Sequence, residues 1–414
     1  MAFTLPNGRE LICATGGRCA NTKTAVAANR IRYESRHSVA TGKSPLKYIR
    51  LVYGNYIVDG SVGGTEVNTG NAVTIECSVE IPSTPTPGPI RVKFGGVDAA
   101  TMPDGAADFY SDVIPASAFG LTTIPAGTVM WVKDSFLVST GQNIPYGTGW
   151  SYATGEGAYQ SAAASAQVMT AGVLTLPAGG VASTHKSPMV AVVGAFTSTV
   201  PSLFIFGDSI LDRQLDSYSN GLLGAGGGFA VRACYDPATE FYLPHTVLAV
   251  GGGQAVVTAS NMAKRLKIAK YCTHGFVNYA TNDIGTAGAS AAAILAANKL
   301  IWAAMKATGI KVEQMQLLPR VTGSMTSLGG QVHRAGFGPG STGETVQANN
   351  VANVGSDGLD AVLDLNSVIA AGGDPWKWRF DGGVAYSDGT HPAAATAVPL
   401  LTTAMRSHYA TLTT

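Results

Sequence analysis

Hydrophobic and polar residues follow two different patterns along the chain, and the pattern changes near Pro201. Up to about residue 200, short runs of alternating apolar residues are separated by clusters of Gly, Pro, Asn and Thr. This spacing is typical of an all-β sandwich or jelly roll. The stretch 151–182 is rich in Ala, Ser and Gly. The spacing of its apolar residues does not decide between a loop, a short helix and part of the connection between the halves. The clearest expected strands are 47–53, 72–81, 89–94 and 128–137.

After Pro201, continuous apolar runs alternate with segments of helical spacing. The clearest helix begins near Ser290, a suitable N-cap, has Ile294, Ile301 and Met305 on one face, and ends at Gly309. Strands that alternate with helices predict a parallel sheet covered on both sides. We therefore expect a flavodoxin-like α/β/α domain. Its expected strands are 203–206, 245–250, 274–279 and 312–318.

The length also favours two domains, because 414 residues exceed the size at which a single hydrophobic core stops growing. The expected division is a β-rich accessory domain over 1–200, with a carbohydrate-binding or assembly role, and an α/β domain over 201–414. Residues rich in Gly, Asn and Ser follow the run 312–318. Since long structureless loops in compact domains usually serve a site, we expect a substrate-shaping insert at about 322–372.

Three short polar blocks follow expected strands of this half, and a fourth lies near the C-terminus. In an open parallel sheet the ligand crevice lies beyond the carboxyl ends of the strands, so residues in these positions are the first candidates for chemistry. The nucleophilic hydroxyl of an acyl-transfer enzyme needs a base, a group that orients the base, and donors for a developing oxyanion. The blocks are Gly207-Asp208-Ser209, Gly251-Gly252-Gly253, Thr281-Asn282-Asp283 and Asp388-Gly389-Thr390-His391.

Together these blocks can supply every group that this chemistry requires. Ser209 lies at a strand-to-helix turn and can offer its hydroxyl as the nucleophile. His391 can accept the Ser209 proton, and Asp388, three residues earlier, can hold the imidazole. Glycine in the second block lets a backbone N–H approach the substrate, and Asn282 can add a side-chain N–H. Asp208 and Asp283 are expected to bind turn backbone.

In order and spacing, the blocks resemble the SGNH (GDSL) hydrolase family over about residues 201–410. The resemblance implies that Ser209, Asp388 and His391 form a catalytic triad, and that Ser209, Gly252 and Asn282 form the oxyanion hole. Gly252 is favoured because Val250-Gly251-Gly252 fits the Val-Gly-Gly run in which the family donor commonly stands. One residue departs from the family pattern, because Ala280 stands where the third block usually has glycine.

Three further residues are candidates for substrate binding. Trp376 and Trp378, shortly before the fourth block, could stack on a sugar or line an acyl pocket, although aromatic residues at i and i+2 are as often strand packing. His333 lies in the expected insert and could contact substrate. The remaining histidines are expected at the surface or as hydrogen-bonded core residues.

Composition excludes several other classes of function. A formal net charge of +1 gives no basic field for nucleic acid. Polar residues and Pro201 interrupt the most apolar stretch, 189–206, so no membrane span is expected. Neither glycine cluster, 224–228 nor 251–253, fits a nucleotide-binding motif, and no Cys-x-x-Cys is present, so no cofactor and no metal site are predicted. The five cysteines are expected as buried free thiols, with a Cys13–Cys19 disulfide as the alternative.

The predicted function is a serine esterase that hydrolyses a carboxylic ester through an acyl-enzyme. The family allows acetylated polysaccharides, short esters, thioesters and lipids, and the β-rich half together with the Gly-rich insert favours deacetylation of a carbohydrate. The alternative is a carbohydrate-binding or surface adhesion protein, such as a virion component, with a vestigial hydrolase domain. An extracellular or surface location is expected, although the first residues show no secretory signal pattern.

Overall fold

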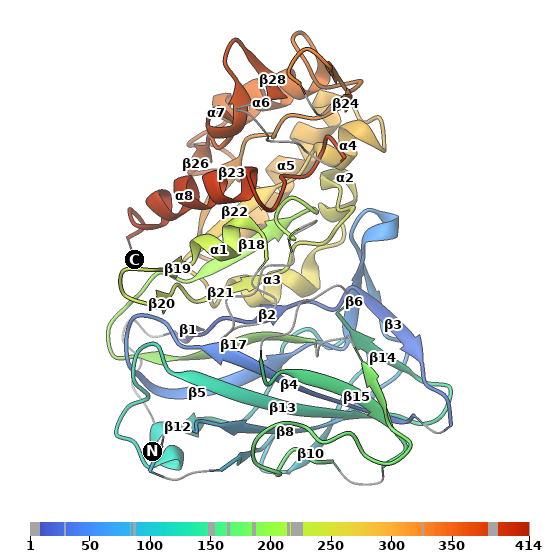
Figure 1. Ribbon diagram of the computed structural model, residues 1–414, viewed down its shortest axis with the longest axis vertical. Coiled ribbons are helices and arrows are strands. Elements are labelled where there is room, and N and C mark those ends of the chain that lie inside the picture. Colours follow the sequence, from blue (N-terminus) through green and yellow to red (C-terminus); the bar gives the residue numbers. More distant parts are fainter. Residues whose placement is uncertain are drawn as a thin grey trace.

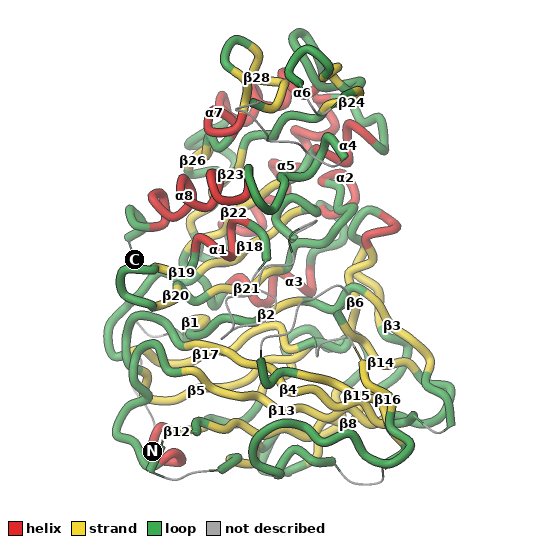
Figure 2. Tube along the Cα trace, viewed as in Figure 1, coloured by secondary structure: helices red, strands yellow, loops and turns green. Residues whose placement is uncertain are grey.

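The structure is a computed structural model that describes residues 9–413 except 29, 83, 86–87, 148–153, 164–165, 184–187, 213–215, 217–226, 325–326 and 380–387. Strands fill the lower part of the molecule in Figure 2, whereas most helices lie in the upper part around a further group of strands. The chain is therefore mixed α/β, as predicted. Figure 1 traces these layers by residue number.

The described strands before residue 200 lie mainly in two antiparallel sheets. One contains β1 (Leu11–Ile12), β17 (Met189–Phe196), β5 (Leu46–Tyr53), β11 (Phe109–Tyr110) and β12 (Ile114–Pro115). The other contains β10 (Ala99–Met102), β8 (Val73–Glu80), β9 (Ile90–Val92), β13 (Val129–Leu137), β4 (Arg32–Ala40), β15 (Gly157–Ser161) and β16 (Val181–Ser183). Apart from β2 (Gly17–Arg18), which belongs to the parallel sheet described below, the other described elements are two strand pairs and two 3₁₀ helices. These are β3 (Thr22–Ala25) with β14 (Asn143–Tyr146), β6 (Tyr56–Asp59) with β7 (Thr65–Asn68), η2 (Gly60–Val62) and η3 (Ala116–Phe119).

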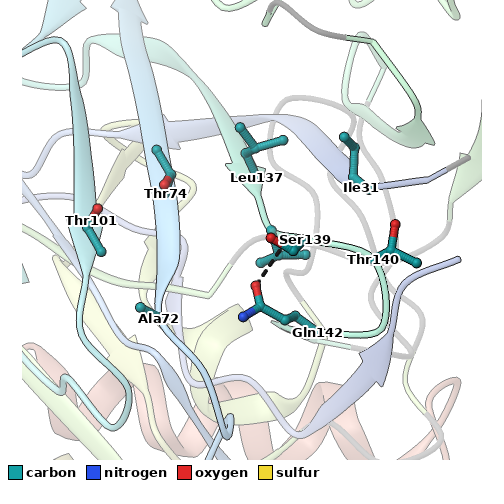
Figure 3. A pocket seen from close by; sticks show the side chains of 9 residues that line it. Ile31, Ala72, Thr74, Thr101, Leu137, Ser139, Thr140 and Gln142 are labelled. Atoms are coloured by element: carbon teal, nitrogen blue, oxygen red, sulfur yellow. Dashed lines mark hydrogen bonds between the residues drawn. The ribbon is translucent and has the colours of Figure 1, made fainter. Parts of the chain in front are cut away.

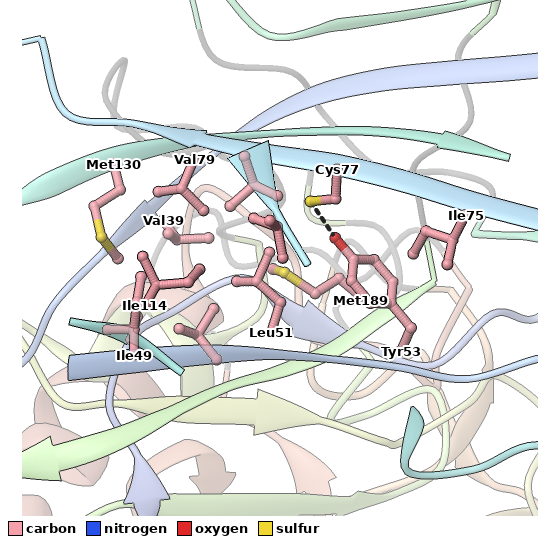
Figure 4. Packing of buried hydrophobic residues seen from close by; sticks show 14 of the residues in the cluster. Val39, Ile49, Leu51, Tyr53, Ile75, Cys77, Val79, Ile114, Met130 and Met189 are labelled. Atoms are coloured by element: carbon pink, nitrogen blue, oxygen red, sulfur yellow. Dashed lines mark hydrogen bonds between the residues drawn. The ribbon is translucent and has the colours of Figure 1, made fainter. Parts of the chain in front are cut away.

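The four strands expected here correspond to β5, β8, β9 and β13, and the undecided stretch 151–182 contributes β15 and the start of β16. In β8, alternate residues from Val73 to Val79 are fully buried, as a strand with one covered face requires. Figure 4 shows Cys77 and Val79 packed against Leu51 of β5 and Met189 of β17. The two sheets therefore enclose one apolar core.

The sheet after residue 200 is parallel and has the strand order β2-β21-β18-β22-β23-β26. Without β2, the chain order is 2-1-3-4-5, which is the flavodoxin-like arrangement. The added edge strand β2 comes from the N-terminal half, and the predicted division at residue 200 stays a prediction. The bounds are β2 (Gly17–Arg18), β18 (Leu203–Gly207), β21 (His245–Val247), β22 (His274–Asn278), β23 (Lys311–Met315) and β26 (Ala361–Leu363).

Helices cover both faces of the parallel sheet. Leu203 and Ile205 of β18 pack in the core with α1 and α8, whereas Phe204 and Phe206 face α2, α3 and α5. The longest helix, α5, has Ser290 as its N-cap, with Ser290 Oγ accepting the Ala293 N–H at 3.2 Å, as predicted. The helices are α1 (Phe229–Ala233), α2 (Ala255–Thr258), α3 (Ala263–Ala269), α4 (Thr281–Gly285), α5 (Ala291–Lys306), α6 (Thr342–Ala352), α7 (Asn366–Ile369) and α8 (Ala397–Tyr409).

One core is shared by the two halves of the chain. Val52 of β5 and Val190 of β17 belong to the same buried cluster as Phe204 and Phe206 of β18. Figure 1 shows β17 and β2 beneath the parallel sheet, where this core lies. The N-terminal half therefore covers part of one face of the sheet that ends at the predicted site.

The predicted insert 322–372 is not a structureless loop. It contains β25 (Gln331–His333), α6, α7, β27 (Ala370–Ala371) and most of β24 (Val321–Gly323), and β28 (Asp374–Trp378) follows it. It also contains β26, which is a strand of the parallel sheet itself. Helix α6 has no clear amphipathic pattern, since Val346 and Val351 are its only large apolar residues. The five cysteines are buried free thiols, so the structure does not contain the alternative Cys13–Cys19 disulfide.

Candidate active site

The first block forms a tight turn at the carboxyl end of β18. A side chain at Gly207 would clash with the Asn278 carbonyl, so glycine lets β18 and β22 stay paired to their ends. The Asp208 N–H donates to Asn278 O at 3.1 Å, and Asp208 Oδ1 accepts the Ile210 N–H at 2.9 Å. Asp208 therefore binds turn backbone, as expected. Ser209 is at the centre of this turn with 6% of its surface exposed.

The fourth block brings a histidine and a carboxylate to this serine. His391 Nε2 lies 2.8 Å from Ser209 Oγ, and His391 Nδ1 lies 2.6 Å from Asp388 Oδ2. Asp388 Oδ1 accepts the N–H groups of Thr390 and His391, each at 2.9 Å. Burial raises the pKa of Asp388, but the hydrogen bonds from the His391 side chain and from these two N–H groups outweigh it and hold the pKa below its ordinary value. The structure thus brings the three predicted side chains together.

The second block is a glycine turn in which the three backbone N–H groups differ. The Gly251 N–H donates to Asp212 Oδ2 at 3.2 Å, and the Gly253 N–H donates to Val250 O at 3.1 Å. For the Gly252 N–H, the described residues offer no hydrogen-bond acceptor. Gly252 has φ +82°, and a Cβ there would clash with the Gly60 carbonyl. Gly252 is therefore the residue of this block whose N–H has no acceptor among the described residues.

The third block begins helix α4 and is hydrogen-bonded to the glycine turn. Asn282 Nδ2 donates to Gly253 O at 3.1 Å, which joins the second and third blocks. The Asp283 carboxylate accepts the N–H groups of Ala280 at 3.1 Å, Ala255 at 2.9 Å and Val256 at 3.0 Å. It therefore binds backbone at the starts of α4 and α2, as expected.

Ala280, which departs from the family pattern, has an unusual backbone conformation. Its φ is +95°, in the left-handed region where a Cβ is unfavourable and glycine is preferred. This explains why glycine is the usual residue at this point. The chain holds the strained alanine in place through the Ala280 N–H bond to Asp283 and the burial of its side chain.

Burial also perturbs the carboxyl group next to the nucleophile. Burial raises the pKa of Asp208 to about 7, with a further increase from the nearby Asp283 and Asp212, although the Ile210 N–H and Arg320 act against it. Its Oδ2 atom has no hydrogen-bond partner among the described residues. Asp208 is therefore a buried acid with one satisfied oxygen, directly beneath the serine turn.

Arg320 is a site residue that the sequence reasoning missed. Its Nη1 donates to Thr281 O at 2.7 Å and its Nε to Thr390 Oγ1 at 3.2 Å, so one buried guanidinium joins the third and fourth blocks. A side chain at Gly285 would clash with this guanidinium. Its position in the sequence was the missed signal, because Arg320 follows the apolar run 312–318 just as the first three blocks follow theirs.

The two tryptophans do not have the exposure that a sugar-stacking role requires. Trp376 is 2% exposed and packs against Phe337, and Trp378 is fully buried. Trp378 Nε1 instead donates to Gly389 O at 3.2 Å, so this indole supports the fourth block from within the core. Stacking on a sugar is therefore not supported, and both residues pack in the core; a role in lining an acyl pocket stays a prediction.

His333 has a partner of its own in the same region. Its Nε2 lies 2.9 Å from Asp374 Oδ2, and 30% of its side chain is exposed. A contact between His333 and substrate stays a prediction. Among the described residues, no cluster of three or more His, Cys, Asp or Glu side chains could hold a metal ion, and no helix is long and apolar enough to cross a bilayer.

A pocket of about 580 Å³ lies elsewhere, on the N-terminal sheets. Figure 3 shows Thr74, Thr101, Ser139 and Gln142 around it, with Ile31 and Leu137 at its apolar side. Its lining has hydroxyl, amide and aliphatic groups but no histidine or carboxylate. It therefore lacks the groups for ester hydrolysis and is separate from the four blocks.

No family model and no curated protein matches the chain. Solved structures do match. The chain resembles GDSL-type lipolytic proteins and carbohydrate esterases. One is a family two carbohydrate esterase from Clostridium thermocellum in complex with cellohexaose, at 10% identity and TM-score 0.36, with 97% of this chain and 98% of that chain covered.

Two further matches cover about half of this chain. A member of the lipolytic protein G-D-S-L family from Veillonella parvula has 16% identity and TM-score 0.35, with 51% of this chain and 100% of that chain covered. A psychrotrophic esterase from a Pseudoalteromonas species has 13% identity and TM-score 0.36, with 50% and 96% covered. At such identities and TM-scores these likenesses carry no argument about chemistry, which rests on the geometry of the four blocks.

Proposed function

We propose that this chain is an SGNH-type serine esterase that hydrolyses a carboxylic ester through an acyl-enzyme. The observation that carries the proposal is the continuous hydrogen-bond path from Ser209 Oγ through His391 to Asp388, with distances of 2.8 and 2.6 Å. Hydroxyl, imidazole and carboxylate in this order are the arrangement that activates a serine for attack on a carbonyl. The path lies at the carboxyl ends of the parallel strands, where ligands bind in open α/β sheets.

In the proposed first step, His391 Nε2 takes the proton from Ser209 Oγ as this oxygen attacks the ester carbonyl carbon. The carbonyl oxygen becomes an oxyanion, for which the Ser209 and Gly252 N–H groups and the Asn282 amide are the proposed donors. The tetrahedral intermediate collapses, the alcohol leaves with the proton from His391, and the acyl group stays on Ser209. Water then attacks with the same help from His391, and it releases the carboxylic acid and restores the serine.

The proposed role of Asp388 is to hold the His391 ring and to stabilise the imidazolium that forms in both steps. Its low pKa supports this role, because the group is then a carboxylate when His391 gains its proton. The two backbone N–H groups on Asp388 Oδ1 leave Oδ2 for the imidazole. The whole unit is therefore oriented before a substrate arrives.

We further propose that the ester substrate is an acetylated carbohydrate. Helix α6, whose Val346 packs in one cluster with Ala280 next to the third block, is mostly polar on its exposed side. Glu344 and Thr345 are exposed, and Val351 is its one exposed large apolar residue. A lipase lid needs a broad apolar face for contact with lipid. A polar neighbourhood favours a small acyl group on a polar alcohol.

Hydrolysis of p-nitrophenyl acetate by the wild type and by Ser209→Ala tests the ester hydrolase assignment. We expect turnover in the wild type and none above background in the folded variant, and equal rates would remove the assignment in favour of a binding protein with a vestigial domain. A series of p-nitrophenyl esters with increasing acyl chain length tests the proposed preference for an acetyl group. A kcat/KM that is highest for acetate agrees with deacetylation, whereas a maximum at octanoate would favour a lipase or thioesterase.

A further inference from the structure

We propose that the N-terminal half of the chain positions the glycine turn of the oxyanion hole, through Arg18 and through the hairpin β6–η2–β7. This inference rests on the proposed function, because it assigns a role to residues that contact the turn Gly251–Gly253. The evidence consists of two separate contacts from the N-terminal half to that turn. Neither contact includes a residue of the four blocks other than the glycines.

The first contact is a buried ion pair. Arg18 Nη1 donates to Asp212 Oδ1 at 2.9 Å, and Asp212 Oδ2 accepts the Gly251 N–H at 3.2 Å. The side chain of Arg18 is 4% exposed and that of Asp212 is 19% exposed. Arg18 lies in β2, opposite Val247 of β21, the strand that leads to the glycine turn. The arginine therefore fixes the carboxylate whose other oxygen holds Gly251.

The second contact is the tip of the hairpin β6–η2–β7, residues 56–68. A Cβ on Gly60 would clash with the Gly251 carbonyl, and a Cβ on Gly252 would clash with the Gly60 carbonyl, so the two backbones touch directly. One step further on, Gly63 O accepts the Gln254 N–H at 2.9 Å. In Figure 1 the hairpin rises from the lower sheets toward α2. The tip therefore packs along the whole glycine turn and the start of α2.

The hairpin is anchored firmly enough to serve as a support. Glu66 accepts the N–H groups of Lys264 at 2.7 Å and Arg265 at 2.9 Å at the start of α3, and it pairs with Arg265 Nε at 3.0 Å. The side chains of Glu66 and Arg265 are 5% and 0% exposed. The Val58 N–H donates to Ala20 O at 2.9 Å, which joins the hairpin to the segment that follows Arg18. The two contacts thus belong to one connected support.

The consequence concerns the direction of the Gly252 N–H. A donor stabilises an oxyanion only when it lies within hydrogen-bond distance of the place where the charge develops. A small displacement of the turn therefore reduces the stabilisation of the transition state more than the binding of the substrate. Arg18, Asp212 and Gly60 are positioning residues in this view, since they act through the glycine turn and do not contact the substrate.

The first experiment measures kcat and KM for p-nitrophenyl acetate in Arg18→Met and Arg18→Lys, with melting temperature on the same preparations. Loss of a whole oxyanion donor costs on the order of 10² to 10³ in kcat, so we expect about a tenfold fall for a displaced donor in Arg18→Met, with KM within about twofold. Arg18→Lys keeps a cation for Asp212 and should recover much of kcat. Arg32→Met is the matched control, since it removes another buried arginine, paired with Glu76 at 3.0 Å within the N-terminal sheets.

The second experiment displaces the turn without removing a charge. Gly60→Ala should push Gly251 and Gly252 out of place, and we expect kcat to fall with little change in KM. Gly157→Ala is its control, because a Cβ on Gly157, also in the N-terminal half, meets no atom within 4 Å. We expect the control to keep wild-type kcat.

The outcomes separate this inference from the proposed function. If the wild type has no more esterase activity than Ser209→Ala, the proposed function itself has failed. If the wild type is active and folded Arg18→Met and Gly60→Ala keep wild-type kcat, the positioning role is wrong although the enzyme assignment stands. A fall in kcat that Arg32→Met and Gly157→Ala share would also overturn it, because the effect would then reflect general loss of stability.

Discussion

The two sides of the proposed crevice are held in place in different ways. On the acid-base side, Asp388 orients His391 through a turn of four residues, and among the described residues its carboxylate bonds only groups within that turn. On the oxyanion side, the Gly251 N–H is held by Asp212, 39 residues away, which in turn is held by Arg18, 194 residues from it. One side is built by local sequence and the other by contacts between distant parts of the chain.

This difference predicts which changes each side tolerates. A turn closed by its own hydrogen bonds should keep its geometry when the rest of the molecule is altered, because its partners are fixed by the same few residues. A glycine turn supported from another part of the chain depends on the packing between the two halves, which share the core around Phe204 and Val190. Substitutions on the two sides should therefore differ in the size of their effect on kcat and in how far from the site a substitution still affects kcat.

The largest effects are expected on the acid-base side itself. His391→Ala should lower kcat for p-nitrophenyl acetate by about 10⁶-fold and Asp388→Ala by about 10⁴-fold, because the base is lost in the first and only its orientation and stabilisation in the second. Steady-state kinetics with melting temperatures would measure both. Equal, small effects would show that His391 does not act as the base, although it lies 2.8 Å from Ser209 Oγ.

The next effect is expected at the donor side chain on the oxyanion side. Asn282→Ala should lower kcat by about 10² to 10³-fold with little change in KM, because the amide bonds the oxyanion more strongly than the neutral carbonyl. The variant also loses the bond from Asn282 to Gly253 O. A normal kcat in a less stable protein would instead assign Asn282 a purely structural role.

The sequence allowed the acid-base side to be predicted more completely than the oxyanion side. Asp388 and His391 stand three residues apart, so their contact follows from one turn, and Ser209 follows a recognisable buried strand. Gly252 was chosen from a run of three glycines by resemblance alone. Its contact with Gly60 and the link from Arg18 could not be predicted, since no local pattern indicates which distant backbone will approach a glycine.

The same limit applies to the fold. Strands with clear alternation, such as β8, and the capped helix α5 were predicted within a few residues. The polar helix α6 and the short strand β26 were taken as a loop, since neither has a long apolar face. The exposure of Trp376 and Trp378 was also overestimated, because burial of an aromatic residue near a site depends on the elements that cover it.

Arg320 joins the two sides, and its replacement should have a moderate effect. Arg320→Met removes the bonds to Thr281 O and Thr390 Oγ1, so we expect kcat to fall about tenfold through displacement of the third and fourth blocks. Arg320→Lys should recover little, because one ammonium cannot reproduce the two directed bonds of the guanidinium. Arg406→Met is a suitable control, since Arg406 also bonds backbone carbonyls, those of Tyr235 and Arg232, away from the blocks. Equal kinetics in the Arg320 and Arg406 variants would exclude the bridging role.

The last effect is expected at Asp208, and it concerns stability and not kcat. Burial raises the pKa of Asp208 to about 7 in the folded protein, above its ordinary value of 3.8. A carboxyl group whose pKa is raised on folding favours the folded state when it is protonated. Its contribution is therefore complete below about pH 4 and is lost as the pH rises toward and through 7.

Asp208→Asn should remove this dependence, because the amide keeps an oxygen for the Ile210 N–H but does not ionise. Relative to wild type, the variant should thus gain stability between pH 5 and pH 8, as measured by denaturant unfolding at each pH.

Asp236→Asn is a useful comparison of opposite sign: hydrogen bonds from Lys43, Thr239 and the Ala238 N–H lower the pKa of this exposed carboxyl to about 2. Its contribution is present above pH 4 and lost as the pH falls toward 2. Substitution there should therefore lower stability by the same amount at every pH from 5 to 8 and leave the pH dependence in that range unchanged. An Asp208→Asn curve parallel to that of the wild type would contradict the raised pKa, because Asp208 would then be ionised throughout this range in both the folded and the unfolded state.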